Sequence, residues 1–393
     1  MPYLKASRAA IVSPMYVNGT TVARELARKG LYVVGVDSDE NAPGLSSRYV
    51  KERAAIPPPE SNPNALSDYI LGRRDLYGGI VVPTDDYRVL DLHSNFDALS
   101  KHYHLAVSPG DSTAIALDKW RAVETARTAG VPVPRTVRIT SEADIAGAAD
   151  EVPFPAILRA RFSLAFVREF GRKNFPVENR SQVEEFYHTA AAGGHEMLLQ
   201  ETIPGEDRRV VSCKGYVSDE GEPLFLLPGV KLLQYPPVHG VGQVQEARKI
   251  PKVEELSERV LRAMGLRGTV CAVEFKYDAR DGLWKFLEVN CRTLMSTGLL
   301  KFAGADALEM LYRDKTGLPQ LPLPRIRYGR KIGYVKNALL RHRGYPESRL
   351  TPREYLHVYG PPITFGMLDL RDLKPFIRDI WPLFRRRFSS APE

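Results

Sequence analysis

The sequence predicts a soluble globular protein in which an α/β part with a doubly wound parallel sheet precedes an α+β part. Residues 9–115 alternate strand-like and helix-like segments, such as AAIVSP, GTTVARELARKG and LYVVGVDSD, an order typical of a parallel sheet covered by helices. From Met197 onward, strand-like segments follow one another, which favours an antiparallel sheet. A chain of 393 residues exceeds one ordinary core, so we expect two or three subdomains.

The composition narrows the class of ligand and the compartment. A net charge of +8 suits a polyanionic ligand such as a nucleotide. Cys213, Cys271 and Cys291 form no CxxC pair, which favours a reducing compartment and argues against zinc. No apolar stretch approaches the roughly 20 residues that a membrane crossing needs, so we expect a cytoplasmic protein. The basic run at 385–388 is either a solvated terminus or a contact with an anionic membrane surface.

Ligands of doubly wound sheets bind at the carboxyl ends of the strands. In the N-terminal part these ends lie near Asp37, Thr84, Asp85 and Asp86, and we take the first three as candidate substrate contacts. The segment 18–20, Asn-Gly-Thr, opens a helix and suits either a phosphate or a plain helix cap.

The segment KFLEVNCRTLMS, residues 285–296, raises the question of why a strand carries several polar side chains in a row. Together with the preceding strand TVCAVEFKYD it predicts a hairpin. A three-residue loop at 280–282, with its glycine left-handed, would put Ala279 opposite Leu283 and therefore Glu274 opposite Glu288.

Opposed carboxylates on one face of a sheet repel each other, and burial increases the cost. A magnesium ion between Glu274 and Glu288 would turn this defect into a site, because Mg²⁺ takes a few carboxylates and leaves positions for phosphate oxygens. Asn290 shares the face of Glu288 and can be a third ligand. Arg292, the next residue on that face, can meet charge on a transferring phosphoryl group or a substrate carboxylate.

A second interpretation of the hairpin needs no metal. Glu274 would pair with Lys276 or Lys285, and Glu288 with Arg292, in a sheet half exposed to water. The hairpin alone does not choose between the two interpretations.

The order of several segments extends the comparison. Asp118-Lys119, AGVPVP, FPAILRA, LLQETIPGED, AVEF and FLEVN follow one another along the chain. In this order the chain resembles ATP-grasp enzymes from about residue 9 to residue 325. It is most similar to the carboxylate-amine ligases related to D-aspartate ligase and more distantly to D-alanine:D-alanine ligase.

The resemblance implies an ATP-grasp fold preceded by a Rossmann-like domain, with ATP and Mg²⁺ bound between two α+β subdomains. We therefore expect four units. They are a Rossmann-like domain at 1–115, a small subdomain at 116–195, a central catalytic subdomain at 196–325 and a C-terminal extension at 326–393.

By the same resemblance, several cations would reach the phosphates of ATP. Lys119 matches the first phosphate-binding lysine of the family, and Arg159 stands where a second lysine is usual. Lys173 lies in a segment that corresponds to a lid over the phosphates, with Arg168 and Arg172 as alternatives.

The segment LLQETIPGED corresponds to the family's adenine-binding hinge. Backbone groups around Gln200, Glu201 and Ile203 would pair with the ring, and Asp207 would hold the ribose. Without its neighbours, the segment would better suit an ordinary strand and turn.

The remaining site residues also follow from the resemblance. Glu274, Glu288 and Asn290 match the family's magnesium ligands. Arg292 resembles an arginine of the D-aspartate ligase relatives and of the carboxylase-like branch, whereas the position of another family arginine is held here by Ala272.

Lys231 is our candidate for a contact with the γ-phosphate or an acyl phosphate. Tyr235, His239 and Gly240 lie in a loop that would approach the substrate, and His239 would be either a general base or a hydrogen-bond partner.

These expectations define a reaction. ATP would phosphorylate a substrate carboxylate, and an amine would then displace phosphate to form an amide, with Lys231, Arg292 and Arg159 as catalytic residues. The alternatives are a carboxylase that uses carboxyphosphate and an inactive nucleotide-binding module. We expect small-molecule substrates and no nucleic acid, and family analogy suggests a homodimer.

Overall fold

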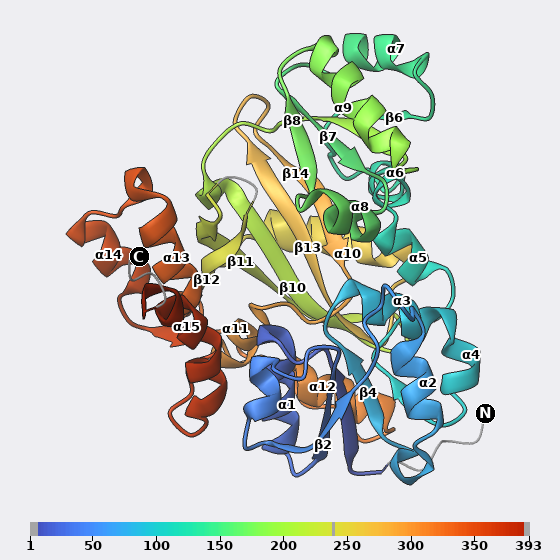
Figure 1. Ribbon diagram of the computed structural model, residues 1–393, viewed down its shortest axis with the longest axis vertical. Coiled ribbons are helices and arrows are strands. Elements are labelled where there is room, and N and C mark those ends of the chain that lie inside the picture. The colour runs from blue at the N-terminus through green and yellow to red at the C-terminus, as the bar shows by residue number, and fades with distance from the viewer. Residues whose placement is uncertain (1–6, 238–239, 389–393) are drawn as a thin grey trace.

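The structure is a computed structural model that describes residues 7–237 and 240–388. Three sheets are stacked along the long axis of the molecule, with a seven-stranded sheet between a five-stranded and a four-stranded one (Figure 1). The C-terminal segment lies beside the central sheet. The predicted fold class, a parallel α/β part followed by α+β parts, is confirmed.

The N-terminal sheet is parallel throughout, in the order β3-β2-β1-β4-β5. Its strands are β1 (Ala9–Ser13), β2 (Tyr32–Asp37), β3 (Val50–Ala55), β4 (Ile80–Pro83) and β5 (His104–Leu105). The helical segments around it are α1 (Val17–Ala27), η1 (Pro43–Ser46), α2 (Ala65–Leu71), η2 (Arg74–Leu76), α3 (Asp86–Ser94), α4 (Phe96–Leu99) and α5 (Ser112–Leu117). All five residues of β1 are buried, as expected of a strand with both faces covered.

The four-stranded sheet is antiparallel, in the order β6-β9-β7-β8. Its strands are β6 (Thr136–Ile139), β7 (Ala156–Ala160), β8 (Asn174–Val177) and β9 (Met197–Glu201). The helices of this part of the chain are α6 (Lys119–Thr128), α7 (Asp144–Glu151), α8 (Ser163–Phe170) and α9 (Arg180–Ala192). Strand β9, which our division of the sequence assigned to the central subdomain, pairs with β6 and β7 in this sheet.

The central sheet has the order β14-β13-β10-β11-β12-β15-β16 and is antiparallel except between its last two strands. Its strands are β10 (Val210–Val217), β11 (Pro223–Tyr235), β12 (Val241–Ala247), β13 (Thr269–Asp278), β14 (Leu283–Asn290), β15 (Lys331–Gly333) and β16 (Ile363–Phe365). The accompanying helical segments are η3 (Asp207–Arg209), α10 (Pro251–Met264), α11 (Thr297–Phe302), α12 (Ala307–Lys315), α13 (Val335–Gly344), η4 (Pro346–Ser348), α14 (Pro352–Tyr359) and α15 (Leu373–Phe388).

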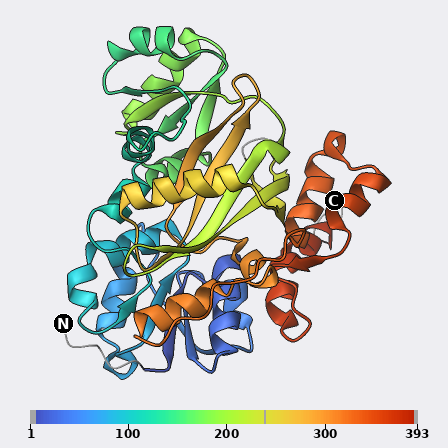
Figure 2. The same cartoon turned by 180° about the vertical axis from the view of Figure 1, so that it is seen from behind.

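Helix α10 covers the rear face of the central sheet (Figure 2). It begins with Pro251 in its first turn and ends at Gly265, whose φ of 66° is left-handed, so both ends carry residues suited to them. Its apolar side chains Val253, Leu256 and Val260 are buried against the sheet. The opposite face of the sheet is thereby left to line the cavity described below.

The hairpin of β13 and β14 brings Glu274 opposite Glu288, as predicted. The predicted loop is wrong, because Asp278 rather than Ala279 faces Leu283. Four residues, 279–282, form the loop, and the Gly282 N–H closes it by donating to the Asp278 carbonyl at 2.9 Å. The Asp278 carboxylate accepts the Arg280 N–H at 3.0 Å, which stabilises the start of the loop.

A second deviation restores the predicted pairing. The register shifts by one residue between the pairs Phe275–Phe286 and Glu274–Glu288, so Leu287 is an extra residue in β14. The longer loop and the extra residue cancel beyond this point. The two glutamates therefore share one face of the sheet, and Asn290 shares it with them.

The C-terminal segment is fastened to the N-terminal domain by a buried ion pair. The Arg24 Nε of α1 donates to the Asp372 carboxylate at 2.9 Å, and both side chains are at most 4% exposed. The same carboxylate accepts from the Ser47 hydroxyl at 2.6 Å and the Arg48 N–H at 3.0 Å. The pairing of β15 with β12 extends the central sheet into this segment.

Helix α15 ends the described chain and carries exposed apolar side chains at Leu373, Ile377, Trp381 and Phe384. Across residues 7–237 and 240–388, no helix combines the length and the apolar content that a membrane crossing requires.

Replacing Asp372 with alanine should lower the free energy of unfolding by about 3–5 kcal/mol, because it leaves the Arg24 charge buried without its partner. Chemical denaturation followed by circular dichroism measures this loss. The control Glu184→Ala removes an exposed i,i+4 pair with Arg180, which should contribute less than about 0.5 kcal/mol. Equal losses in both variants would show that Asp372 does not anchor the segment.

Candidate active site

A cavity of about 440 Å³ lies between the four-stranded sheet and the open face of the central sheet. Its wall includes residues of α1, of the strands β7 to β14 and of the loops that follow β9 and β14. The residues singled out from the sequence that line it are Asn18, Arg159, Lys173, Gln200, Glu201, Ile203, Asp207, Lys231, Gly240, Glu274, Glu288, Asn290 and Arg292. Asn18 does not cap its helix, because it lies within the first turn of α1 after the N-cap Tyr16, and its side chain donates to the Thr84 carbonyl at 2.8 Å. Segments distant in the sequence thus meet in the one cavity.

Both glutamates of the hairpin have cationic partners from other elements. Lys231 Nζ, on β11, lies 3.0 Å from Glu274 Oε2. Lys119 Nζ, at the start of α6, lies 3.5 Å from Glu288 Oε2, and the Arg159 guanidinium of β7 lies 3.6 Å from the same oxygen. Lys119 therefore stands at the site although it is not part of the cavity wall.

The metal-free interpretation of the hairpin predicted other partners for these glutamates. Arg292 pairs with Asp86 instead of Glu288, and Lys285 pairs with Glu201 and with the aspartates of the hairpin loop. The two glutamates face the cations of the cavity, and the pairings with Lys285 and Arg292 are not formed.

The clustered charges shift the pKa values of the site. Burial would raise the pKa of Glu288, but the positive charges of Lys119, Lys173, Arg159 and Lys231 outweigh it and hold that pKa far below its usual range. Burial, reinforced by the nearby Arg159 charge, lowers the pKa of Lys119 to about 8. Burial also lowers the pKa of Arg159. An anion added to this site would relieve repulsion among its cations.

Arg292 is oriented by the N-terminal domain. Its Nε and a terminal nitrogen donate to the two carboxylate oxygens of Asp86 at 2.6 and 3.0 Å, a bidentate geometry that fixes the guanidinium plane. A terminal nitrogen also lies 3.5 Å from Asn290 Oδ1. Asp86 begins helix α3, and Asp85 caps that helix by accepting the Arg88 N–H at 2.8 Å.

The segment 200–203 and the loop after it form the far end of the cavity. Gln200 accepts from the Arg159 guanidinium at 3.0 Å and donates to the Thr136 hydroxyl at 2.9 Å. Asp207 accepts from the Gln234 side chain at 2.7 Å and from the Gln234 N–H at 3.1 Å. Both side chains are thereby held in place at the cavity wall.

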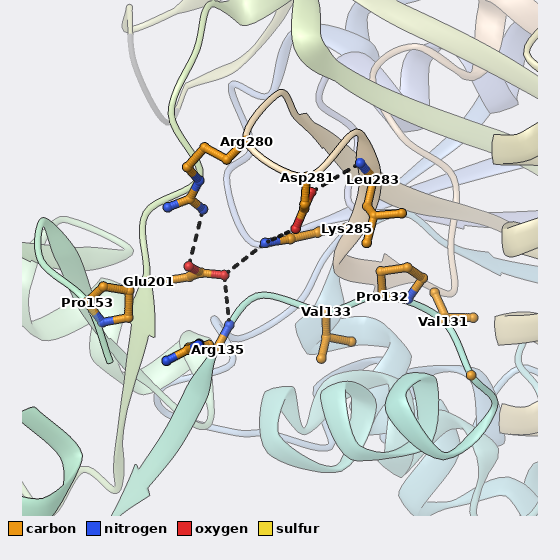
Figure 3. A pocket seen from close by; sticks show the side chains of 11 residues that line it. Val131, Pro132, Val133, Arg135, Pro153, Glu201, Arg280, Asp281, Leu283 and Lys285 are labelled. Carbon is orange, nitrogen blue, oxygen red and sulfur yellow. Dashed lines mark hydrogen bonds and ion pairs between the residues drawn. The ribbon is translucent and has the colours of Figure 1, made fainter. Parts of the chain in front are cut away.

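The Glu201 side chain also reaches a second cavity, of about 690 Å³, behind this segment (Figure 3). Its carboxylate accepts from the Arg135 N–H at 3.0 Å and from Lys285 Nζ and Arg280, each at 3.2 Å. These contacts tie β9 of the four-stranded sheet to the hairpin of the central sheet. The Glu201 carboxylate is therefore used for structure.

Two backbone N–H groups of the same segment already have hydrogen-bond partners within the protein. The Glu201 N–H donates to the Arg135 carbonyl at 2.9 Å, and the Thr202 N–H donates to the Pro155 carbonyl at 3.1 Å. Ile203 follows these two residues and lines the 440 Å³ cavity.

The three substrate candidates of the N-terminal domain lie at strand ends, as predicted, but outside the cavity wall. Asp37 accepts the N–H groups of Met15 and Asp39 at 2.6 and 2.9 Å. The Thr84 hydroxyl donates to the Pro14 carbonyl at 2.7 Å. Burial raises the pKa of Asp85 to about 6, and its carboxylate caps α3.

The candidates of the loop after β11 have different positions. Gly240 lines the 440 Å³ cavity, whereas Tyr235 lines a smaller pocket beside it. His239 lies outside the described residues.

Several polar residues near the cavity were not assigned roles from the sequence. Lys214 on β10 is 2% exposed, and burial lowers its pKa to about 8. Its Nζ donates to Gln245 Oε1 at 2.6 Å, and Gln245 lines the cavity. The sequence did offer a sign of this role: a lysine inside the apolar run VVSCKGYV is expected to be buried, and a buried lysine requires a polar partner. Asp86 was noted only as one of several acidic strand ends.

The oxygen donors at the hairpin fit the ligand preferences of magnesium. Glu274, Glu288 and Asn290 offer oxygen atoms from one face of the hairpin, the ligand type that Mg²⁺ prefers. Within the described ranges, no group of three or more His, Cys, Asp or Glu residues gathers as a metal cluster. Two carboxylates and a carboxamide fit an ion that completes its shell with phosphate oxygens and water.

Sequence comparison finds related enzymes at low identity, and no family model matches the chain. The chain is 25% identical to the D-aspartate ligase of Enterococcus faecium (strain Aus0004) over 195 residues, which are 47% of this chain and 46% of that protein. It is 26% identical to the D-alanine–D-alanine ligase of Pseudomonas fluorescens (strain Pf0-1) over 212 residues, 51% of this chain and 62% of that protein. The match thus spans about half the length of these curated relatives.

Solved structures share the fold over most of the chain. A biotin carboxylase complex from Campylobacter jejuni matches with a TM-score of 0.66 at 17% identity, over 82% of this chain and 74% of that one. N5-carboxyaminoimidazole synthetase from Staphylococcus aureus, complexed with ADP, gives 0.66 at 16% identity over 88% of each chain. An L-amino acid ligase from Bacillus licheniformis gives 0.62 at 14% identity, over 84% and 79%. At these identities the likeness is one of fold.

Proposed function

Since the chain belongs to the ATP-grasp superfamily, we propose that it is an ATP-dependent ligase that activates a carboxylate as an acyl phosphate and joins it to an amine. The observation that carries this proposal is the opposed pair Glu274 and Glu288, with Asn290 beside them, in a cavity where Lys231, Lys119 and Arg159 lie next to the two carboxylates. The similarity to D-aspartate and D-alanine–D-alanine ligases supports the same reaction class.

In this proposal the segment 200–203 receives adenine. The N–H groups of Glu201 and Thr202 already donate to backbone carbonyls, so the Ile203 N–H is the amide that we assign to the ring. Asp207, held by Gln234, is placed to accept from the ribose hydroxyls.

Glu274, Glu288 and Asn290 would hold Mg²⁺, which when bound would neutralise charge on the phosphates. Lys231, Lys119 and Arg159, now paired with the glutamates, would turn toward the phosphate oxygens. Lys173, the residue before β8, would approach from the opposite sheet. Catalysis in this scheme is positioning and electrostatic stabilisation of the transferring group.

Arg292 has a separate role in the proposal. Its guanidinium plane is fixed by Asp86, so its orientation is set before substrate arrives. We assign it to the substrate carboxylate or to the acyl phosphate that forms from it, because a fixed guanidinium matches either anion.

A second candidate function uses the same site. If bicarbonate were the phosphorylated acid, the product would be carboxyphosphate, and the chain would be a carboxylase. Arg292, two residues after Asn290, resembles an arginine of the carboxylase-like branch as well as one of the D-aspartate ligase relatives, so its position is compatible with both candidates. An inactive nucleotide-binding module would bind ATP without turnover. Dimerisation remains a prediction in each case.

The proposal predicts magnesium-dependent release of ADP from ATP that requires both an acid and an amine. A coupled assay over pools of amino acids, dicarboxylates, amines and bicarbonate measures this release. Glu288→Gln should reduce it by about 10²-fold, because it removes a charged magnesium ligand while keeping the side-chain shape.

The matched control is Glu255→Gln, which changes an exposed glutamate on α10 and should leave the rate unchanged. Release with bicarbonate alone would favour the carboxylase. ATP binding without release in any pool would contradict the ligase proposal and support the inactive module.

The pKa of Lys119 predicts how ATP affinity depends on pH. Triphosphate would favour the charged ammonium and raise its pKa from about 8, so binding above pH 8 takes up a proton. The affinity for ATP without magnesium should therefore fall by up to about tenfold per pH unit between pH 8 and about pH 9.5. Isothermal titration calorimetry measures this slope.

Lys119→Arg should flatten the slope, since arginine keeps its charge over this range. An equal fall of affinity in both proteins would assign the titration to another group, such as Lys214.

A further inference from the structure

A smaller pocket, of about 180 Å³, lies where helix α1, the central sheet and the C-terminal segment meet. Two of its wall residues, Val241 and Met295, also line the 440 Å³ cavity. The pocket therefore adjoins the cavity that we assign to ATP and the reacting groups. Its volume is roughly ten times that which one water molecule needs, enough for a bulky side chain.

Apolar surface predominates in this pocket. Aromatic and sulfur-containing side chains make up much of the wall, namely Tyr16, Tyr235, Tyr334, Phe365, Met367 and Phe376. Such walls favour apolar groups, because contact with them removes apolar surface from water.

The charged side chains described in the wall neutralise each other. Lys336 Nζ lies 2.8 Å from Asp379 Oδ1 and donates to the Tyr16 hydroxyl at 2.6 Å. The Tyr16 hydroxyl donates in turn to Asp379 Oδ1 at 3.1 Å. Neither charge is left over to pair with an ionised group of a ligand. A ligand with a carboxylate in this pocket would have to break the Lys336–Asp379 pair.

We infer that the substrate whose carboxylate or amine reacts in the 440 Å³ cavity is an amino acid with a bulky apolar or aromatic side chain, and that this pocket binds that side chain. The inference rests on the proposed ligase function for the reacting end of the molecule. It also separates this chain from a ligase selective for aspartate, whose side-chain carboxylate would need an unpaired cation. The C-terminal segment thus contributes to substrate selection.

Two substitutions change the pocket in opposite directions. Asn337→Trp, on α13, fills the pocket, and Phe376→Ala, on α15, enlarges it. The matched control is Phe384→Ala, which makes the same change on α15 at a position that is 37% exposed and outside the pocket wall. Thermal melting without ligand checks that each variant is folded.

The experiment measures ADP release. Separately, equilibrium dialysis measures the binding of labelled amino acids in the presence of a non-hydrolysable ATP analogue and magnesium. The probes are alanine, aspartate, leucine, phenylalanine and tryptophan, each as both enantiomers. We expect leucine or phenylalanine to bind at least about tenfold more tightly than alanine and aspartate. Asn337→Trp should remove this preference, Phe376→Ala should shift it toward tryptophan, and Phe384→Ala should leave it unchanged.

Two blocked probes identify the reacting end. N-acetylphenylalanine can serve only as the acid, and phenylalanine amide only as the amine. Stimulation of ADP release by N-acetylphenylalanine in the presence of the amine pool, or by phenylalanine amide in the presence of the acid pool, supports the pocket and assigns the role of the substrate.

The outcomes separate the pocket from the ligase. If no probe gives ADP release, but phenylalanine binds in dialysis and this binding is lost in Asn337→Trp, the pocket inference is supported and the ligase proposal is contradicted. If ADP release occurs with alanine or aspartate and neither pocket variant alters the preference, the ligase stands and the pocket inference is overturned. Absence of apolar amino-acid binding in dialysis would also overturn it.

Discussion

The opposition of Glu274 and Glu288 across adjacent strands is the constraint on which the rest of the cavity depends. Two carboxylates on one sheet face repel each other unless cations stand close by. The chain supplies these cations from other elements, with Lys231 on the neighbouring part of the sheet and Lys119 and Arg159 on the far side of the cavity. The position of the four-stranded sheet over the central sheet is therefore linked to the charge of the hairpin.

This arrangement accounts for the opposite pKa shifts of its members. Positive charges hold the pKa of Glu288 down, while burial beside another cation lowers the pKa of Lys119. Arg159, Lys173 and Lys231 also stand near Glu288. Triphosphate with magnesium would supply both an anion for these cations and a cation between the carboxylates. The ion pairs of the free protein and the contacts proposed with ATP use the same side chains.

The sequence predicted the parallel and antiparallel sheets and the facing glutamates, because spacing along a strand determines which side chains share a face. It did not predict the four-residue loop or the extra residue Leu287, whose effects on the register cancel. Hydrogen bonds of Asp278 select the loop, and those contacts become evident only once the hairpin is closed.

The strand-end rule located the correct edge of the N-terminal sheet, but its substrate candidates Asp37, Thr84 and Asp85 do not line the cavity. Asp37 and Thr84 have short side chains beside backbone groups that need partners, so they bond locally. Asp86 instead meets Arg292, which is distant in the sequence. The C-terminal segment carries no motif, so its contribution to the small pocket could not be foreseen. The charged groups that acyl-phosphate chemistry needs gather in one cavity, and a neutral, largely apolar pocket lies beside it. Because the two sets of residues differ, the pocket can change which substrate is selected without altering the charged groups.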